Sequence, residues 1–407
     1  MAAKSQGEKK VRNHIPDDLV FSILSKLSLK PLKRFGCVRK TWALLLENPC
    51  FQTNFISIPH SYYDGTSLLL YEAVECLDYS LHCSFYLLSD ERYENQVKLD
   101  FPNPFQEDNP FSDFYNCDFY GCDTFTGTLC LKQRNTLSLW NLTTHEFKVI
   151  PLSPIEFVPP YREASVDVHG FGYDYIKDDF KIIRYIQFTP ISSGRLKRLN
   201  VQHEDVSWNE ISYEPEWEIY SLRCNSWKKH DVNMPKRWCS GSYEPLYIDG
   251  LSHWWSVSEN CDEHLLVSFD LSNEMFFTTT IPIDIPLDID TNFHLGFVYR
   301  RLVVLNRSIA SISWYLLDKT IFYISILGEL GVKESWTKLF VVGPLPYIDR
   351  LIGAGKNGDI FFQKKDGKLV CFSLSTQKTE ELGVKGAHFY DLAIYKKSFL
   401  SIGGINH

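Results

Sequence analysis

The sequence predicts an α+β protein made of a short segment of three helices followed by a much larger all-β body. Apolar residues between positions 15 and 51 recur at helical spacing. Beyond residue 56, short apolar runs alternate with turn residues, and no long amphipathic helix is evident. Aromatic residues make up 15% of the chain, and nearly all of them lie in this body, where they favour strands.

The overall composition is that of a globular protein. The 407 residues are 44% hydrophobic and 23% charged, which excludes wholesale disorder and collagen. No run approaches the ~18 apolar residues of a membrane helix, and the N-terminus lacks the apolar core of a secretory signal. We therefore expect no membrane partner, and we expect the eleven cysteines to be reduced thiols of a cytoplasmic or nuclear protein.

Charge divides the chain into two unequal parts. Residues 1–51 hold ten Lys and Arg against four Asp and Glu, a net charge of +6, and residues 52–407 hold 32 against 46, a net charge of −14. This asymmetry suggests two parts with different partners. A net charge of +6 is too small to indicate a nucleic-acid partner.

The helical segment has recognisable start and stop signals. Residues 1–14 are polar and are predicted to be a disordered tail. Pro16 and the acidic pair after it suit the first turn of a helix. Pro31 ends this first helix, and Pro49 ends the third. Apolar residues follow these signals in a stripe that comprises Leu19, Val20, Ile23, Leu24 and Leu27, with Leu32, Phe35, Trp42, Leu45 and Leu46 behind it.

This segment is too apolar to stand alone. Nineteen of the 37 residues from 15 to 51 are apolar, more than three short helices can bury among themselves. Domains below ~40 residues rarely fold unaided. We therefore expect an interface here, either with the rest of the chain or with another protein.

The order of residues in this segment resembles the F-box family. The family motif opens with Leu-Pro and an acidic pair, and this chain has Ile15-Pro16 in that place. The later parts of the motif follow in order over 37 residues as Leu19, Ile23-Leu24, Lys33-Arg34-Phe35, Cys37-Val38 and Lys40-Thr41-Trp42. The resemblance implies an F-box domain over residues 15–55.

The F-box resemblance also implies partners. F-boxes dock on a small acidic adaptor of the Skp type, which joins them to a cullin and a RING subunit in an SCF ubiquitin ligase. The positive charge of this segment suits an acidic adaptor. Ile23, Leu24, Leu27 and Phe35 can instead belong to the segment's own core, and their spacing does not separate the two roles. The adaptor-binding residues carried over by position are Ile15, Pro16, Leu19, Ile23, Leu32, Val38 and Trp42.

The body repeats one unit: an apolar strand with an aromatic anchor, a polar turn and a second strand. The anchors Trp140, Tyr220, Phe269 and Phe372 are 80, 49 and 103 residues apart, which is close to two, one and two periods of 40–50 residues. This period favours the four-stranded blades of a β-propeller. Segments 170–188 and 353–369 are expected to form intermediate blades. Six to eight blades are possible, with a twisted sandwich as the alternative.

The body also resembles the F-box-associated domain of a large plant family. The resemblance rests on GTLCL (127–131), GFGYDYIKDDFKIIRY (170–185), IYSLRCNSW (219–227) and SFDLSNEMF (268–276). Kelch repeats are expected to carry paired glycines in each blade, and Gly403-Gly404 is the only such pair here. We therefore expect a degenerate, kelch-like propeller over residues 56–407 that recognises a protein substrate.

Sequence patterns for catalysis, metals and cofactors are missing. GAGKNGD (353–359) lacks the outer glycine and the Ser or Thr of a phosphate loop. Cys117, Cys122 and Cys130 lack the paired spacing of a structural zinc site. We expect no catalytic residue, no metal and no cofactor. The candidate substrate-binding residues lie instead in the long polar stretch 189–217, and they are Arg195, Lys197, Arg198 and Trp208.

Together these features predict the substrate-recognition subunit of an SCF-type ubiquitin ligase. Such a subunit acts by proximity: it brings a substrate lysine close to a ubiquitin thioester that another enzyme supplies. Two alternatives remain at this level. The first is an adaptor-bound scaffold without ubiquitin transfer. The second is a β-propeller enzyme, for example a glycosidase, with carboxylates in a central pocket.

Overall fold

The chain divides into two units in the computed structural model, Met1–Gly65 and Thr66–His407. In the first unit, the described residues of the predicted F-box are 19, 20, 23, 38–40 and 42. Residues 19, 20, 23, 40 and 42 have helical backbone, and the other residues of 15–55 lie outside the described residues. The residues described are 19–20, 23, 38–40, 42, 66–75, 81–88, 93, 96–100, 118–123, 126–133, 135–156, 161–193, 196, 206–237, 245–260, 263–282, 298–305, 308–315, 319–355, 358–374, 376–386, 389–403 and 405–406.

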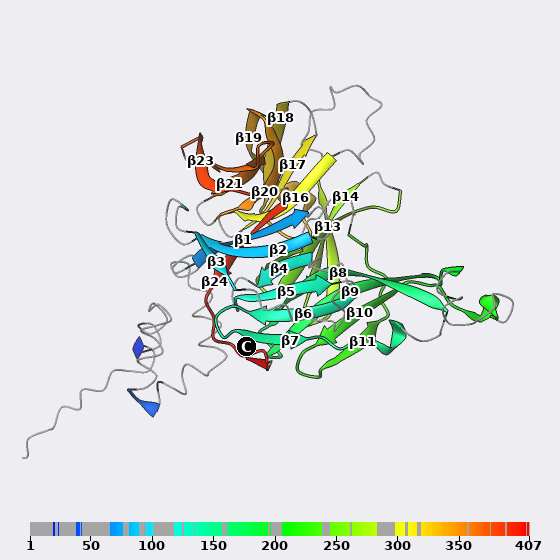
Figure 1. Cartoon of the computed structure of the whole chain (residues 1–407). Helices are drawn as coiled ribbons and strands as arrows, with labels where there is room; N and C mark the ends of the chain where they lie inside the picture. The colour runs from blue at the N-terminus through cyan, green and yellow to red at the C-terminus, as the bar shows by residue number, and fades with distance from the viewer. Residues whose placement is uncertain are drawn as a thin grey trace, which may run out of the picture. The chain divides into compact units, whose positions relative to one another are not determined.

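The second unit is a six-bladed β-propeller (Figure 1). Each blade is an antiparallel sheet of four strands, and one sheet carries a fifth. From the innermost strand outward, blade 1 comprises β24 (Phe389–Lys396), β1 (Thr66–Glu75), β2 (Leu81–Leu88) and β3 (Gln96–Leu99). Blade 2 comprises β4 (Asp118–Asp123), β5 (Thr128–Gln133), β6 (Thr136–Asn141), β7 (Glu146–Val149) and β25 (Ile405–Asn406).

The other four blades follow in chain order. Blade 3 comprises β8 (Arg162–Asp174), β9 (Asp179–Pro190), β10 (Glu216–Ser221) and β11 (Ser226–His230). Blade 4 comprises β12 (Leu246–Ile248), β13 (Leu251–Val257), β14 (His264–Asp270) and β15 (Met275–Ile281). Blade 5 comprises β16 (Val298–Leu305), β17 (Ser308–Tyr315), β18 (Lys319–Leu327) and β19 (Trp336–Pro346). Blade 6 comprises β20 (Ile348–Ala354), β21 (Asp359–Lys364), β22 (Lys368–Ser373) and β23 (Lys378–Lys385), and short 3-10 turns η1 (Pro154–Glu156), η3 (Trp208–Glu210) and η5 (Lys333–Ser335) complete the elements.

The innermost strands close a ring. Each of β24, β4, β8, β12, β16 and β20 contacts the next, and β20 contacts β24 again. Blade 1 joins the two ends of the propeller, because the late strand β24 pairs antiparallel with the early strand β1, from Thr66 opposite Lys396 to Ala73 opposite Phe389. In Figure 1 the red β24 lies beside the blue β1.

The predicted repeat unit is the outer hairpin of a blade. The four anchors all lie on the third strand of their blades, and Trp140, Tyr220 and Phe269 are almost fully buried. The prediction of intermediate blades is wrong for 170–188 and 353–369, because these segments contain inner strands of blades 3 and 6. The anchors Trp140 and Tyr220 are therefore one blade apart, since long β8 and β9 and the insertion 191–215 fill the interval.

Large side chains fill the space between neighbouring blades. Trp254 and Trp255 are adjacent on β13, so they point to opposite faces of blade 4. Trp254, 1% exposed, packs with Trp217 of blade 3. Trp255, 3% exposed, packs with Leu302 of blade 5. Blade 4 is therefore held by apolar burial on both of its faces.

Strand connections differ between the two ends of the propeller. One end, which we call the short-turn face, carries the hairpin turns between the first and second and between the third and fourth strands, such as 175–178 and 271–274. The opposite end, the long-loop face, carries 191–215, 231–245 and 282–297. Since Thr66 lies opposite Lys396 at the end of β24, the chain enters the propeller at the short-turn face.

Candidate functional site

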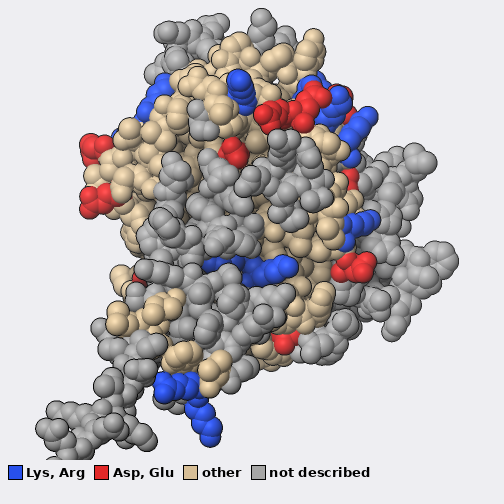
Figure 2. Space-filling view, turned by 90° about the vertical axis from the view of Figure 1, so that its left-hand side faces the viewer, with Lys and Arg blue, Asp and Glu red and all other residues tan. Residues whose placement is uncertain are grey.

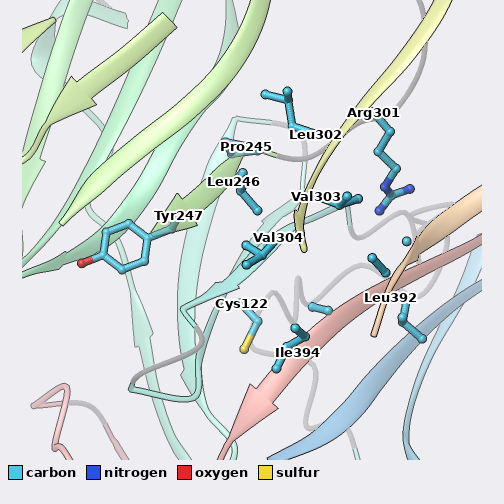
Figure 3. A pocket seen from close by; sticks show the side chains of 14 residues that line it. Cys122, Pro245, Leu246, Tyr247, Arg301, Leu302, Val303, Val304, Leu392 and Ile394 are labelled. Carbon is cyan, nitrogen blue, oxygen red and sulfur yellow. The ribbon is translucent and has the colours of Figure 1, made fainter. Parts of the chain in front are cut away.

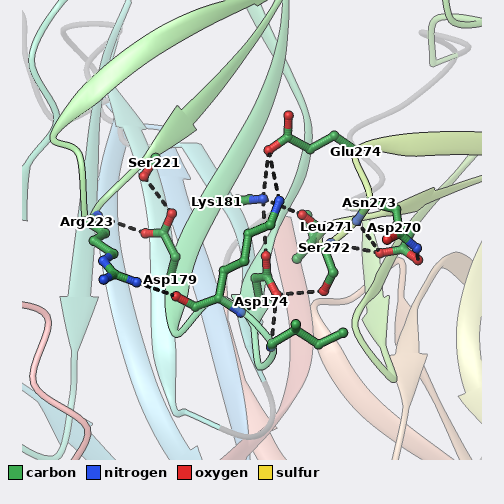
Figure 4. Close-up of polar contacts among 12 residues, drawn as sticks. Asp174, Asp179, Lys181, Ser221, Arg223, Asp270, Leu271, Ser272, Asn273 and Glu274 are labelled. Atoms are coloured by element: carbon green, nitrogen blue, oxygen red, sulfur yellow. Dashed lines mark hydrogen bonds and ion pairs between the residues drawn. The ribbon is translucent and has the colours of Figure 1, made fainter.

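The short-turn face is held rigidly by side chains that cap its turns (Figure 4). Asp174 accepts hydrogen bonds from the backbone N–H groups of Ile176 and Lys177, and Asp270 does the same one blade further on. Such Asx turns replace backbone hydrogen bonds that the turn cannot make. These aspartates therefore have a structural role at the short-turn face.

A buried lysine links two of these turns. Lys181, 2% exposed, places Nζ 3.2 Å from Oδ2 of Asp174 and 2.8 Å from Oε1 of Glu274, and it donates to the carbonyl of Leu271. Burial alone would lower the pKa of Lys181, but the hydrogen bonds to Glu274 and Asp174 outweigh it and raise this pKa. Lys181 therefore stays charged, and its ion pair with Glu274 joins blade 3 to blade 4.

The long-loop face holds a different group, at the junction of blades 2, 3 and 4. Lys132 Nζ lies 5.6 Å from the ring centre of Tyr120, and the guanidinium carbon of Arg237 lies 5.7 Å from the same centre. Arg237 also forms an ion pair of 2.7 Å with Asp167. We call Tyr120, Lys132, Asp167, His169 and Arg237 the junction cluster. It combines an aromatic ring with two cations, a pairing common in binding surfaces.

His169 fixes the position of Arg237. Its Nε2 accepts the backbone N–H of Arg237 at 2.8 Å, so its Nδ1 carries the proton and donates to the carbonyl of Asp167 at 3.1 Å. Burial lowers the pKa of His169 to about 4, so the ring is neutral at pH 7. It packs edge-on against Trp217, with ring centres 4.7 Å apart. The histidine therefore positions Arg237, and it stays neutral at pH 7 while Nδ1 donates its hydrogen bond to Asp167.

Solvent reaches the junction cluster through its basic rim. Lys236 is exposed, and its Nζ lies 5.9 Å from the ring centre of Tyr185. Lys132 is half-buried and donates to the carbonyl of Val166 at 2.6 Å. Burial lowers the pKa of Lys132, and the nearby carboxylates of Asp118 and Asp167 act in the opposite direction. The rim offers positive charge and aromatic surface to a partner.

Sequence reasoning missed the junction cluster. Its members come from β4, β5, β8 and the loop after β11, and no local motif connects them. The sequence feature that could have indicated it is the pair of basic residues Lys236 and Arg237 in the connection between two blades.

The predicted substrate-binding stretch is only partly described. Arg195, Lys197 and Arg198 lie outside the described residues, and Trp208 begins η3 with a half-buried side chain. Leu196 and Val206 are 3% and 7% exposed. The predicted role of the four named residues stays a prediction, but the stretch around them is anchored by buried apolar side chains.

The predicted adaptor-binding residues fall in the N-terminal unit. Ile15, Pro16 and Leu32 lie outside the described residues. Leu19, Ile23 and Val38 are 52%, 53% and 66% exposed, and Trp42 is half-buried. These exposures leave the apolar side chains available to a partner. They do not test the predicted adaptor-binding role, which stays a prediction.

The centre of the ring holds a cavity of about 80 Å³ (Figure 3). Strands β4, β12, β16, β20 and β24 contribute lining residues. Arg301 supplies the charge among these residues, and it pairs with Asp391 at 2.7 Å. The cavity is smaller than the ~300–1,000 Å³ of small-molecule sites. Its lining residues include no pair of carboxylates of the kind that the glycosidase alternative requires.

On the face drawn in Figure 2 the charged side chains of described residues are dispersed, and among the described residues metal ligands do not cluster. Figure 2 shows basic and acidic side chains of described residues interspersed in small groups on one side of the molecule. Within the described ranges, no three His, Cys, Asp or Glu side chains converge as metal ligands. A helix suited to crossing a membrane is likewise not found among the described residues.

The match to a protein family agrees with this architecture. The F-box associated beta propeller domain family matches residues 79–398. F-box protein CPR1 of Arabidopsis thaliana is 24% identical over 390 residues, which cover 91% of this chain and 84% of CPR1. The Arabidopsis thaliana protein At3g16210, named as an F-box protein, is 27% identical over 279 residues, which cover 66% of this chain and 61% of At3g16210. Among solved structures, dipeptidyl peptidase 4 of Porphyromonas gingivalis has 8% identity and a TM-score of 0.35 over 82% of this chain and 46% of that one, too low to carry an argument.

Proposed function

The chain belongs to the family of F-box-associated β-propeller domains, and from this we propose that it is the substrate-recognition subunit of an SCF-type ubiquitin ligase. The observation that carries the proposal is the family match over residues 79–398 behind an F-box-like segment at 15–51. Neither part needs a catalytic residue of its own, because proximity to a charged ubiquitin-carrying enzyme is sufficient for transfer.

The proposed adaptor-binding surface belongs to the N-terminal unit. Leu19, Ile23 and Val38 expose apolar side chains there. Apolar groups of this kind are stabilised when a partner buries them, at about 25 cal/mol per Å². We propose that a Skp-type adaptor buries them together with Ile15, Pro16, Leu32 and Trp42, and that the adaptor brings the cullin and RING subunits.

The substrate-binding end rests on the long-loop face. This face holds the junction cluster and the longest connections between strands, and the chain enters the propeller at the opposite face. Binding residues commonly lie on loops that a rigid scaffold positions. We propose that a protein substrate docks over Tyr120, Lys236 and Arg237.

Co-purification with a Skp-type adaptor tests the first half of the proposal. We expect the full chain to co-purify with the adaptor, and the double variant Leu19→Asp, Trp42→Ala to lose it. Val232→Asp is the matched control, because Val232 is an exposed apolar residue of the propeller, 47% exposed. Failure of the folded wild-type chain to bind the adaptor would refute the ligase assignment.

Substrate turnover separates the ligase from the scaffold alternative. The reconstituted complex with cullin and RING subunits is expected to ubiquitylate a protein captured through the long-loop face. Capture and adaptor binding without any ubiquitin transfer would favour a scaffold.

A further inference from the structure

Tyr347, which joins β19 to β20 at the long-loop face, combines an exposed side chain with a left-handed backbone. The residue is 71% exposed, and its φ is 64°. Positive φ values are costly for a large L-residue, and glycine or asparagine adopts them most readily. A tyrosine at this position therefore gains little from burial and carries backbone strain.

Blade 6 uses this backbone conformation but does not need this side chain. The carbonyl of Tyr347 accepts the N–H of Lys365 at 2.9 Å, which ties the start of β20 to the end of β21. Tyr161 has a φ of 73° at the equivalent place in blade 3, where its carbonyl accepts the N–H of Ile191 at 3.1 Å. That tyrosine is half-buried, whereas Tyr347 is exposed. Strain that does not serve packing is a reason to look for a functional contact, so the side chain of Tyr347 is a candidate binding group.

A turn and a strand end lie beside Tyr347 at the same end of blade 6. The turn 365–367 joins β21 to β22, and its first residue donates to Tyr347. On the other side of the turn, the N–H of Gly386 donates to the carbonyl of Gly367 at 3.2 Å, directly after Lys385 at the end of β23. We call Tyr347, the turn 365–367 and Lys385 the blade 6 tip.

The blade 6 tip holds more positive charge than its carboxylates neutralise. Glu381 pairs with Lys364 at 2.5 Å and with Lys368 at 3.1 Å, and Asp366 lies 3.9 Å from Nζ of Lys368. The two remaining lysines are exposed and form no ion pair with any described residue; they are Lys365 and Lys385. The tip therefore offers two uncompensated cations beside an exposed aromatic ring.

This surplus of positive charge is local. Residues 52–407 carry a net charge of −14, so the propeller as a whole repels a long polyanion such as a nucleic acid. A short anionic segment interacts mainly with charges within the Debye length, about 10 Å at 0.1 M salt. The tip therefore suits a short acidic peptide better than a nucleic acid.

We propose that the blade 6 tip binds an acidic segment of a partner protein, in which closely spaced anionic side chains pair with Lys365 and Lys385. The hydroxyl of Tyr347 donates a hydrogen bond to one of these anions, and its ring covers the neighbouring backbone. This inference rests on the proposed function in one respect, because it takes the partner to be the substrate. The tip lies on the same long-loop face as the junction cluster, so one substrate protein can contact both.

Fluorescence anisotropy with a defined peptide tests the tip on the full chain. The probe is labelled octaglutamate, and octaglutamine is the uncharged control peptide. We expect saturable binding of octaglutamate, weakened by salt between about 50 and about 300 mM, and about fivefold weaker binding to Lys385→Glu. Lys378→Glu is the matched control, because Lys378 is an exposed lysine at the other end of the same strand. It lies about 24 Å away, more than two Debye lengths at 0.1 M salt.

The variant Tyr347→Asn tests the role of the tyrosine. Asparagine tolerates a positive φ, so the urea midpoint of unfolding should stay the same or rise. Binding of octaglutamate should nevertheless fall about threefold, since the exposed hydroxyl and ring are lost. A purely structural role would lower the midpoint instead. Tyr161→Asn makes the same backbone change in blade 3, on the opposite side of the ring, and should leave peptide binding unchanged.

Several results would overturn this inference. They are absence of saturable binding up to about 1 mM octaglutamate, equal binding of octaglutamine, or equal losses in Lys378→Glu and Lys385→Glu. Tighter binding of a single-stranded octathymidylate would identify a nucleic acid as the partner instead.

Two further measurements refine the assignment. A peptide of alternating glycine and phosphoserine is measured beside octaglutamate, and the tighter of the two identifies phosphate or carboxylate as the preferred anion. Peptide binding needs no adaptor, and Lys385→Glu should co-purify with the adaptor as the wild type does. Peptide binding without adaptor binding would therefore refute the ligase assignment alone, and the reverse result would refute only the tip.

Discussion

Leu70 of β1 lies directly opposite Leu392 of β24 in one antiparallel sheet, although the two residues belong to opposite ends of the propeller sequence. Both are buried, at 0% and 6% exposure. The pairing means that blade 1 forms only when the two ends of the propeller meet. Because β24 also contacts β4 and β20, the same strand closes the inner ring.

Truncation after Gly386, which removes β24, is expected to abolish cooperative unfolding of the propeller. The deletion exposes the partners of Leu392, Ile394 and Tyr395, which are all buried. At about 2 kcal/mol for each side chain, plus a ladder of hydrogen bonds, the loss approaches the whole stability of a domain. Thermal unfolding followed by circular dichroism measures it. Truncation after Gly403 removes only the short β25 and is the control; a cooperative transition in both truncated chains would contradict this account of closure.

Replacing Lys181 by Met is expected to destabilise the protein by about 3 kcal/mol. The variant leaves Asp174 without its buried cation, and breaking a buried pair costs about 3–5 kcal/mol, somewhat less here because Glu274 is partly exposed. The free energy of unfolding in urea measures the loss. Lys228→Met is the matched control, because Lys228 contacts the same Glu274 at 3.6 Å with a side chain that is 77% exposed. An exposed pair contributes about 0–1 kcal/mol, so equal losses would show that burial is not the cause.

Stability is expected to fall as the pH drops below about 6.5, where unfolded histidine takes up a proton. Burial lowers the pKa of His169 to about 4 and that of His253 to about 3. The unfolded chain therefore binds more protons than the folded one, and each such histidine adds up to about 1.4 kcal/mol of lost stability per pH unit. Urea unfolding between pH 4.5 and 6.5 measures the slope.

The variant His169→Gln assigns part of that slope. Glutamine can still accept the Arg237 N–H, but it does not titrate, so the slope should decrease by about one proton. The exposed His145 provides the control variant His145→Asn, since asparagine tolerates its backbone φ of 58°. An unchanged slope in His169→Gln would mean that this ring is not neutral and buried in solution.

Charge reversal at the junction cluster is expected to weaken substrate capture and to leave adaptor binding intact. Lys236→Glu replaces a cation near the Tyr185 ring, on the exposed rim of the cluster, by an anion. We expect substrate affinity to fall about tenfold, which corresponds to about 1.4 kcal/mol. Pull-down of a reconstituted complex measures both interactions. Lys338→Glu is the control, because Lys338 lies over the Tyr323 ring of blade 5; equal losses in both variants would exclude the cluster as the docking site.

The repeating aromatic anchors could be interpreted correctly because their signal is local. Each anchor lies on a strand that leads directly into a polar turn; the anchors are Trp140, Tyr220, Phe269 and Phe372. Such strand–turn–strand units can be predicted from apolar alternation and turn residues alone. The number of blades could not be counted in the same way. Blade 3 contains strands of 13 and 12 residues and an insertion, so its spacing imitates two blades.

The sequence by itself determined the family, the all-β body and its outer hairpins, because these depend on residue order and on contacts between neighbours in the chain. The tertiary structure alone decided that there are six blades, that β24 joins β1, and that Tyr120, Lys132, His169 and Arg237 meet on one face. The physical reason is that ring closure and blade packing pair residues hundreds of positions apart, and no local pattern encodes which of them will meet.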